Sequence, residues 1–312
     1  MPYKYFITDV FTDTPFGGNQ LAVLPDARGL NDAQMQAIAR EFNFSETTFV
    51  FPPENSKNTR KVRIFTPASE LPFAGHPTVG TAYVLAYANE VPLSGDETRI
   101  VFEEGVGPVP VTIRSRDGKP VFMQLTAAKI PERRPTSVDA AGLADILSLE
   151  PSDILYDEHF VPEAVSAGVP FLFVPLRSLD ALARARVRTD VWERTLKGAW
   201  AAEMFLWVET PDSVHRGGIK SGDAELRARM FAPALGLGED PATGGAAAAF
   251  GGYLAARCEK RDGLLKWLVH QGVEMGRPSR LEVETDVVGG EVKAVRVGGA
   301  SVLVSSGELL VP

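Results

Sequence analysis

Two segments of this 312-residue chain have the length and composition of helices but carry no charge on any face. One reads FAGHPTVGTAYVLAYA from Phe73 to Ala88, and the other reads ATGGAAAAFGGYLAA from Ala242 to Ala256. A helix that packs on one side only needs polar residues along its exposed side. We therefore expect both helices to be buried all round, with strands wrapped about them.

The residues that precede the two segments indicate an internal repeat. RIFTPASELPFAG begins at Arg63 and RMFAPALGLGEDPATG begins at Arg229, and both contain Arg, Phe, Pro, Glu, Pro and Gly in that order. The second copy is three residues longer. An ordered match of this kind predicts two pseudo-symmetric halves. The alternative is that a strand, a turn and an apolar helix simply recur, as they do in many α+β proteins.

The rest of the chain alternates strand-like runs with short helices. Asn31 and Gln34 are spaced as a capping box at the start of one such helix. The segment TAAKIPERRPTS after Leu125 is rich in proline and charge, which is typical of a connection between domains. We predict an α+β protein with an N-terminal domain over residues 1–125, to which the last C-terminal strand can be added, and a C-terminal domain over residues 126–312.

Composition argues against several kinds of partner. The formal net charge is −8, and no Lys/Arg stripe interleaved with aromatic residues follows any segment, so nucleic acid is not expected as a partner. The apolar run around Val79 is too short to span a bilayer. Cys258 is the only cysteine, and the chain does not begin like a secretory signal. These features predict a cytoplasmic protein with no membrane partner.

The glycines that open the two apolar helices are candidates for anion binding. A helix that begins at glycine presents free backbone N–H groups and a partial positive charge, and no side chain blocks the approach of a ligand. The amide groups of Gly75, His76, Gly244 and Gly245 are therefore expected to hold a small carboxylate. The alternative for each turn is a glycine required only for packing.

Glu46 is the candidate proton acceptor. It precedes the strand-like run TTFVF and has Phe42, Phe44 and Phe49 nearby in sequence. Apolar surroundings disfavour the charged form of a carboxyl group and raise its pKa from about 4.3, which suits a general acid or base near neutral pH. The alternative is a solvated or capping glutamate.

His76 and Asp240 stand beside the two glycine turns. A helix N-terminus disfavours imidazolium, so a neutral His76 can donate to or accept from a substrate. A buried structural histidine and a helix-capping aspartate are the alternatives. No HxH, HExxH or CxxC spacing is present, and neither a GxSxG elbow nor a phosphate-binding GxxxxGK[ST] loop occurs. No metal or other cofactor is expected.

The segments FGGNQLAVL, SETTFVF, RIFTPASELPFAGHPTVGTA and RMFAPALGLGEDPATGGAA together resemble the PhzF-like family of phenazine biosynthesis, which shares the diaminopimelate epimerase fold. The resemblance covers both halves of the chain. It implies two pseudo-symmetric domains, each an open, barrel-like mixed or antiparallel sheet around a central helix, with the active site in the cleft between them. It also implies a homodimer.

The resemblance assigns roles to particular residues. Glu46 matches the family's acid/base, and His76 and Asp240 match residues that position the substrate and assist proton transfer. Asn19 and the glycine-turn residues Gly75, Gly244 and Gly245 then bind substrate. This implies a cofactor-independent isomerase that moves a proton between carbons of a small unsaturated hydroxy or amino carboxylic acid. The alternatives are a non-catalytic carboxylate-binding protein and a lyase or hydratase that uses the same glutamate.

The chain departs from its relatives at several positions. Epimerases of this fold that use two thiols have cysteines at the positions of Ala74 and Thr243, so stereoinversion by two thiols is excluded here. Gly245 replaces a serine that contacts substrate in the phenazine enzyme, and Gln20 replaces a proline common among relatives. We therefore expect a substrate other than the dihydro-hydroxyanthranilate phenazine precursor.

Overall fold

The computed structural model describes residues 2–215 and 217–311. The chain forms two compact units: unit 1 comprises Met1–Ala128 with Val297–Pro312, and unit 2 comprises Lys129–Arg296. Each unit combines helices with a mixed sheet, as the α+β prediction requires. The domain limits 1–125 and 126–312 stay a prediction, because compactness alone does not show independent folding.

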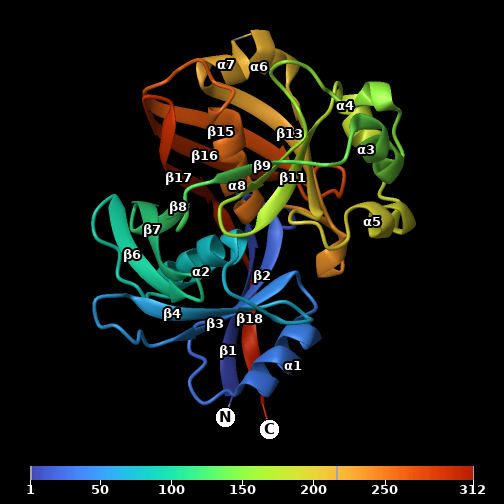
Figure 1. Cartoon of the computed structure of the whole chain (residues 1–312). Coiled ribbons are helices and arrows are strands. Elements are labelled where there is room, and N and C mark those ends of the chain that lie inside the picture. The colour runs from blue at the N-terminus through green and yellow to red at the C-terminus, as the bar shows by residue number, and fades with distance from the viewer. Residues whose placement is uncertain (1, 216, 312) are drawn as a thin grey trace. The chain divides into compact units, whose positions relative to one another are not determined.

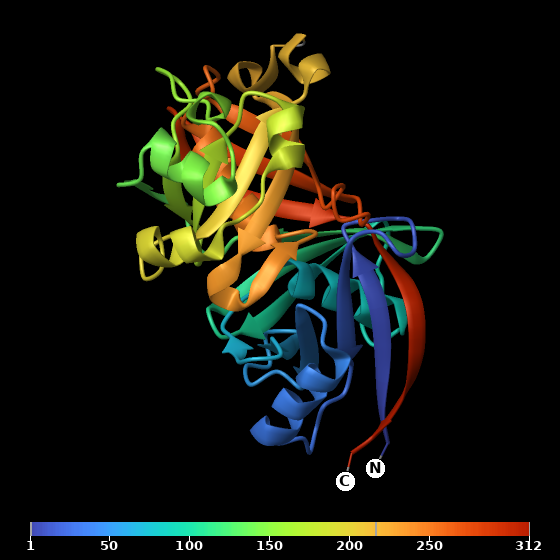
Figure 2. The same ribbon diagram turned by 90° about the vertical axis from the view of Figure 1, so that its right-hand side faces the viewer.

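Unit 1 is built from strands around one long helix, with a second helix packed against the middle strands of its sheet. The two chain ends lie side by side, because the first and last strands pair antiparallel (Figure 1, Figure 2). The elements are β1 (Pro2–Val10), β2 (Asn19–Leu24), α1 (Asp32–Phe42), β3 (Glu46–Phe51), β4 (Arg60–Phe65), β5 (Glu70–Leu71), α2 (Gly75–Tyr87), β6 (Glu97–Glu104), β7 (Gly107–Arg116), β8 (Lys119–Thr126) and β18 (Ser301–Leu310).

Unit 2 repeats this plan and adds several short helices. The chain returns to unit 1 at Val297, within β17 (Glu291–Gly299). The remaining elements are β9 (Glu132–Pro135), α3 (Ala140–Leu147), η1 (Pro151–Asp153), β10 (Glu163–Ser166), β11 (Pro170–Pro175), α4 (Leu179–Arg184), α5 (Thr189–Thr195), β12 (Glu203–Glu209), α6 (Pro211–His215), α7 (Gly218–Ser221), β13 (Asp223–Ala232), η2 (Pro233–Leu235), β14 (Leu237–Asp240), α8 (Gly244–Ala255), β15 (Gly263–Gln271) and β16 (Ser279–Val288).

The two apolar segments form the central helices α2 and α8. Every residue of α2 from Gly75 to Ala86 is buried, and so is every residue of α8 except Gly245. Figure 1 shows strands of unit 1 around α2 and strands of unit 2 around α8. The absence of a polar face thus follows from burial on all sides. The capping box of Asn31 and Gln34 is confirmed at the start of α1.

The sheets of the two units have the same order of pairings. In unit 1 the order β18–β1–β2–β3–β4–β6–β7 is antiparallel except at β2–β3 and β4–β6. In unit 2 the order β9–β10–β11–β12–β13–β15–β16 is antiparallel except at β11–β12 and β13–β15. The parallel pairs occupy the same places in both orders. This shared topology confirms the pseudo-symmetric halves predicted from the sequence.

One ion pair is present in both copies of the repeat. Arg63 donates to both carboxylate oxygens of Glu70 at 2.7 and 2.6 Å, and Arg229 donates to both oxygens of Glu239 at 2.8 Å. Each guanidinium also lies over the ring of the phenylalanine two residues later. The pair fastens the short strand that leads into each central helix. Repeated arginine and glutamate residues in the two motifs therefore have a structural role.

Candidate functional site

The first turn of α2 offers backbone donors rather than a side-chain cap. Ala74 is the residue before the helix, and its side chain makes no capping hydrogen bond. Pro77 has no N–H group, so Gly75 and His76 supply the donors at this end of the helix. Both residues are buried. The arrangement suits an anionic oxygen of a small ligand.

Glu46 lies beside this turn. It opens β3, is 9% exposed, and pairs in parallel register with Leu21 of β2. Thr48 is two residues after Glu46 on the same face of β3, and its hydroxyl is 2.9 Å from the Thr81 hydroxyl of α2. This contact holds β3 against the middle of α2. The Glu46 Oε2 atom consequently lies 3.4 Å from Nε2 of His76.

His76 is held neutral by its surroundings. Desolvation lowers the pKa of His76 to about 3, while a hydrogen bond with the Gln20 backbone opposes the shift only in part. The side-chain Nδ2 of Asn19, which is itself buried, lies 3.2 Å from Nδ1 of the ring. Asn19 therefore fixes the orientation of the imidazole. Unit 1 thus brings together Glu46, His76, Asn19 and Gly75 among the residues predicted from the sequence.

A buried carboxyl group that the sequence analysis missed supports this turn. Glu104, the last residue of β6, has one oxygen 2.7 Å from the Thr78 hydroxyl, which also lies 2.8 Å from the carbonyl oxygen of Ala74. Burial raises the pKa of Glu104 to about 8, and the Thr78 hydrogen bond opposes this in part. A protonated Glu104 can donate to Thr78 while Thr78 donates to Ala74. The chain of hydrogen bonds fixes the residue that precedes the glycine turn.

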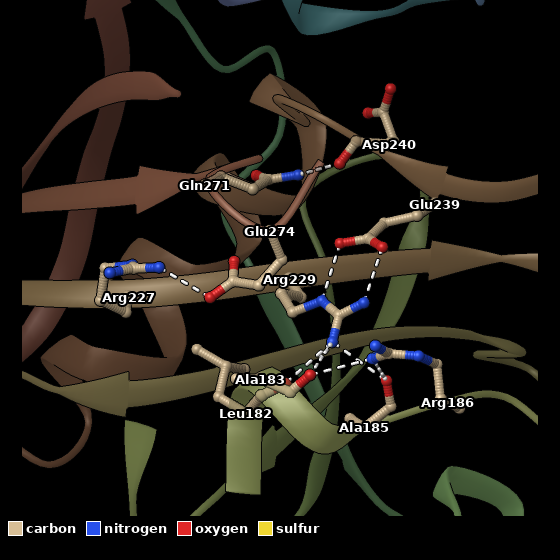
Figure 3. A network of polar contacts seen from close by, with 10 residues as sticks. All are labelled: Leu182, Ala183, Ala185, Arg186, Arg227, Arg229, Glu239, Asp240, Gln271 and Glu274. Carbon is tan, nitrogen blue, oxygen red and sulfur yellow. Dashed lines mark hydrogen bonds and ion pairs between the residues drawn. The ribbon is translucent and has the colours of Figure 1, made fainter. Parts of the chain in front are cut away.

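The corresponding turn of unit 2 uses an amide in place of that acid. The Nε2 atom of Gln271 donates to the Asp240 carbonyl at 2.7 Å and to the Thr243 hydroxyl at 3.0 Å, and its Oε1 accepts from the Thr243 N–H at 3.1 Å. The Thr243 hydroxyl donates to the Asp240 carboxylate at 2.5 Å. Figure 3 shows the Gln271 amide against the Asp240 backbone, with the Asp240 carboxylate directed away from Glu239. Asp240 is thus fixed against Thr243, the residue that precedes Gly244.

Glu104 and Gln271 are equivalent residues of the repeat. β4 pairs with β6 at Lys61 and Glu103, and β13 pairs with β15 at Arg227 and His270, one residue earlier in each case. Each of the two residues is followed by a glycine that packs against the proline before the central helix. In the sequence the two sites share only a Glu or Gln followed by glycine at the end of a strand. This two-residue pattern is too short to be recognised unless the pairing of β6 with β4 and of β15 with β13 is known.

Gly245 has room for a side chain, whereas Gly251 does not. A Cβ atom at Gly245 would meet only the Phe171 ring, at 3.9 and 4.0 Å. A Cβ atom at Gly251 would lie 2.7 Å from the Thr285 hydroxyl and 2.9 Å from a methyl group of Val295. Gly251 is therefore needed for the packing of α8 on its strands, and Gly245 is not.

This difference gives a stability prediction. Gly245→Ser should leave the free energy of unfolding unchanged or raise it by up to about 0.5 kcal/mol, because serine has the higher helix propensity. Gly251→Ala should lower it by about 1–3 kcal/mol, because the added methyl group overpacks the interior. Urea denaturation of the two variants and the wild type measures both effects. A larger loss for Gly245→Ser than for Gly251→Ala would contradict this account of the first turn.

The face of β13 that carries Arg229 and Phe231 holds a second network of polar contacts. Arg229 is buried, and besides Glu239 it donates to the carbonyl groups of Leu182 and Ala185 (Figure 3). A cavity of about 720 Å³ lies over this face, with Arg186, Arg229, Phe231, Glu239, Glu274 and Met275 in its lining. Arg229 uses its N–H groups within the protein, so it has a structural role. The groups suited to chemistry lie instead at the turns of α2 and α8.

Three further features bear on the metals, membranes and thiol chemistry open to the chain. No group of three or more metal-binding side chains occurs among residues 2–215 and 217–311. Within the same residues, no helix has both the length and the apolar character needed to cross a membrane. Cys258 is buried, and desolvation raises the pKa of its thiol, as expected for a structural cysteine.

Comparison with known proteins places the chain among small-molecule isomerases. The profile of the family described as "Phenazine biosynthesis-like protein" matches residues 8–307. An uncharacterized isomerase of Mesorhizobium japonicum is 40% identical, with 99% of each chain covered. The trans-2,3-dihydro-3-hydroxyanthranilate isomerase of Pseudomonas aeruginosa is 34% identical, with 95% of each chain covered. A crystal structure of a PhzF-family protein from Bacillus anthracis has a TM-score of 0.85 at 28% identity and covers both chains fully.

Proposed function

Because the chain belongs to the phenazine biosynthesis-like (PhzF) family of isomerases, we propose that it moves a proton between two carbons of a small unsaturated hydroxy or amino carboxylic acid without a cofactor. One observation carries this proposal. The buried carboxyl group of Glu46 lies 3.4 Å from a neutral imidazole, beside a helix end that offers free backbone amides. That combination is suited to a proton transfer at carbon.

We propose the following steps. The Glu46 carboxylate takes a proton from a carbon conjugated with the substrate carboxylate, and the electron pair of the broken C–H bond moves into the conjugated system. Backbone amides at the glycine turns stabilise the negative charge that develops on the substrate oxygens. The proton on Glu46 exchanges with solvent in part, and protonated Glu46 then delivers a proton to a different carbon on the same face. Atoms and charge balance, and the product is an isomer.

The other predicted residues have supporting roles in this proposal. Neutral His76 can donate one ring N–H to the substrate without adding a full positive charge beside Glu46. Asn19 holds the ring, and Gly75, Gly244 and Gly245 supply amides. The Asp240 carboxylate, oriented by Thr243, accepts a hydrogen bond from a hydroxyl or amino group of the substrate. We also propose that the protein is cytoplasmic, as its composition predicts, and that it is a homodimer, as the resemblance implies. Light scattering of the purified protein tests the dimer.

Deuterium incorporation tests the proposed reaction. The wild-type protein should be incubated in deuterated buffer with trans-2,3-dihydro-3-hydroxyanthranilate and with a panel of unsaturated hydroxy and amino carboxylic acids. An isomerase gives a product of unchanged formula that carries solvent deuterium, which mass spectrometry detects. Loss of water from the substrate would indicate a lyase instead. Thermal stabilisation by a carboxylate without any exchange would indicate a binding protein.

A further inference from the structure

A buried carboxyl group in unit 2 has no role in the function described so far. Glu203 opens β12 and is 5% exposed. The backbone N–H of Ala234 donates one hydrogen bond to it, and its Oε2 atom is buried without a hydrogen-bond partner among the described residues. An unused oxygen on a buried carboxyl group costs desolvation energy. Its retention therefore suggests a partner that binds from outside the chain.

The sheet register makes Glu203 the counterpart of Glu46. Each residue opens a strand that runs parallel to the preceding one, with Glu46 opposite Leu21 and Glu203 opposite Phe171. The residue after each glutamate lies opposite the phenylalanine of the repeated motif, Phe65 in unit 1 and Phe231 in unit 2. The equivalence thus rests on both neighbouring strands.

Packing on α8 places Glu203 near the start of that helix. The Phe205 ring lies 5.2 Å from the Phe250 ring, and the Trp207 ring lies 5.4 Å from Phe250 and 5.7 Å from Tyr253. β12 and α8 therefore run in the same direction. Glu203 lies two residues before Phe205 on the same face of β12, which is about 7 Å back along the strand. The same distance along a helix corresponds to about 4–5 residues. Going back that far along α8 from Phe250, the contact of Phe205, leads to Gly245 and its neighbour in the first turn.

The same step can be checked in unit 1. There Thr48 contacts Thr81, and going back two residues along β3 leads to Glu46. Going back about five residues along α2 leads to His76, and Glu46 does lie 3.4 Å from His76. Position 245 is the counterpart of His76, and it is a glycine. Glu203 therefore faces a position with no side chain.

The space at this position is suited to a ligand. A Cβ atom at Gly245 would meet only the ring of Phe171, the residue opposite Glu203. The side chain of Thr243, the residue before α8, makes no capping hydrogen bond to the first amides of this helix. An anionic oxygen that accepts from the amides of Gly244 and Gly245 would thus also lie within reach of the Glu203 carboxyl group.

We propose that Glu203 is a second substrate-contacting carboxyl group, which donates a hydrogen bond to an oxygen of a carboxylate ligand held at the first turn of α8. The proposal extends the proposed function and rests on it for the class of ligand. Burial raises the pKa of Glu203 to about 7, and the Ala234 hydrogen bond opposes this in part. A protonated carboxyl group donates to an anion, whereas an ionised one would repel it.

Binding measurements on matched variants test the contact. Calorimetric titration uses 3-hydroxyanthranilate as the probe, a stable aromatic analogue of the substrate named for the Pseudomonas aeruginosa relative. Glu203→Leu removes the donor and should raise Kd about 10- to 100-fold. Glu203→Gln keeps an N–H donor of the same shape and should stay within about threefold of the wild type. The control Glu209→Gln changes a carboxyl group at the far end of β12, which bonds to Ser213 and Ile219 within the protein, and should leave Kd unchanged.

A second measurement detects the proton on the Glu203 carboxyl group directly. An infrared difference spectrum between the wild type and Glu203→Gln at about pH 6 should contain the carbonyl stretch of a protonated carboxylic acid. Its absence would overturn the donor role. An unchanged Kd for Glu203→Leu would also overturn the proposal. So would a loss of affinity in Glu203→Gln as large as in Glu203→Leu. A wild type that binds neither the probe nor any acid of the panel would overturn it as well. If binding depends on Glu203 but no substrate exchanges deuterium, the proposed isomerisation is wrong, while the proposed contact between Glu203 and the ligand stands.

Discussion

Glu46→Gln is expected to reduce solvent deuterium incorporation into a turned-over substrate by at least about 10²- to 10⁴-fold, the usual contribution of a general acid or base. Glutamine keeps the shape of the side chain and its place beside His76 but cannot take up a proton from carbon. Binding should change little, because the helix amides are untouched. Mass spectrometry of the product in deuterated buffer measures the exchange, and calorimetry measures the binding.

Two controls make this result specific. Glu54→Gln removes a carboxylate from the exposed ion pair with Lys61, and it should leave both exchange and stability unchanged. Glu46→Asp keeps the acid but withdraws it by one methylene group, so it should retain part of the activity. Undiminished exchange in Glu46→Gln would remove Glu46 from the mechanism. Loss of probe binding in the same variant would assign it to ligand binding instead.

The sequence predicted the elements whose pattern is local. The uncharged stretches after Gly75 and Gly244 predicted buried helices, because burial on all sides is the only way to accommodate a helix without a polar face. The repeated Arg, Phe and Glu residues predicted the pseudo-symmetry, and the structure supplies their reason in two equivalent ion pairs. The candidates Glu46, His76 and Asn19 were found because they lie in short motifs, and the fold of unit 1 brings them together.

Residues whose role depends on strand register were not predicted. Glu104 and Gln271 support the glycine turns from the ends of strands that follow the central helices, so nothing adjacent in sequence marks them. Glu203 looks like an ordinary strand residue until β12 is aligned with β3 through its neighbours on both sides. The segments ETTFVF and EMFLWV share only their first residue and an apolar character. Chemistry of this kind becomes visible only when two strands are paired.

Glu104 should make the stability of the protein fall as pH rises. Its pKa is about 8 in the folded state, against an ordinary value of 4.5. The folded state therefore holds a proton that the unfolded chain releases, and folding is favoured most below about pH 4.5. This contribution is lost progressively between about pH 4.5 and pH 8, where ionisation leaves a buried charge. The shift corresponds to about 5 kcal/mol as an upper estimate.

Glu104→Gln should remove that pH dependence, because its amide can donate to Thr78 without ionising, as Gln271 does at the equivalent place in unit 2. The difference in unfolding free energy between variant and wild type should therefore grow in favour of the variant from about pH 5 to pH 8.5, by up to about 5 kcal/mol. Urea denaturation across this range measures it, and taking the difference cancels the opposite contribution of His76, whose lowered pKa costs stability as pH falls. The reciprocal change Gln271→Glu should add a second loss of stability with rising pH to the one that Glu104 causes in the wild type. Parallel stability curves for Glu104→Gln and the wild type would show that Glu104 is ionised in the folded protein, and the Thr78 hydroxyl would then donate to Glu104 instead of to the Ala74 carbonyl.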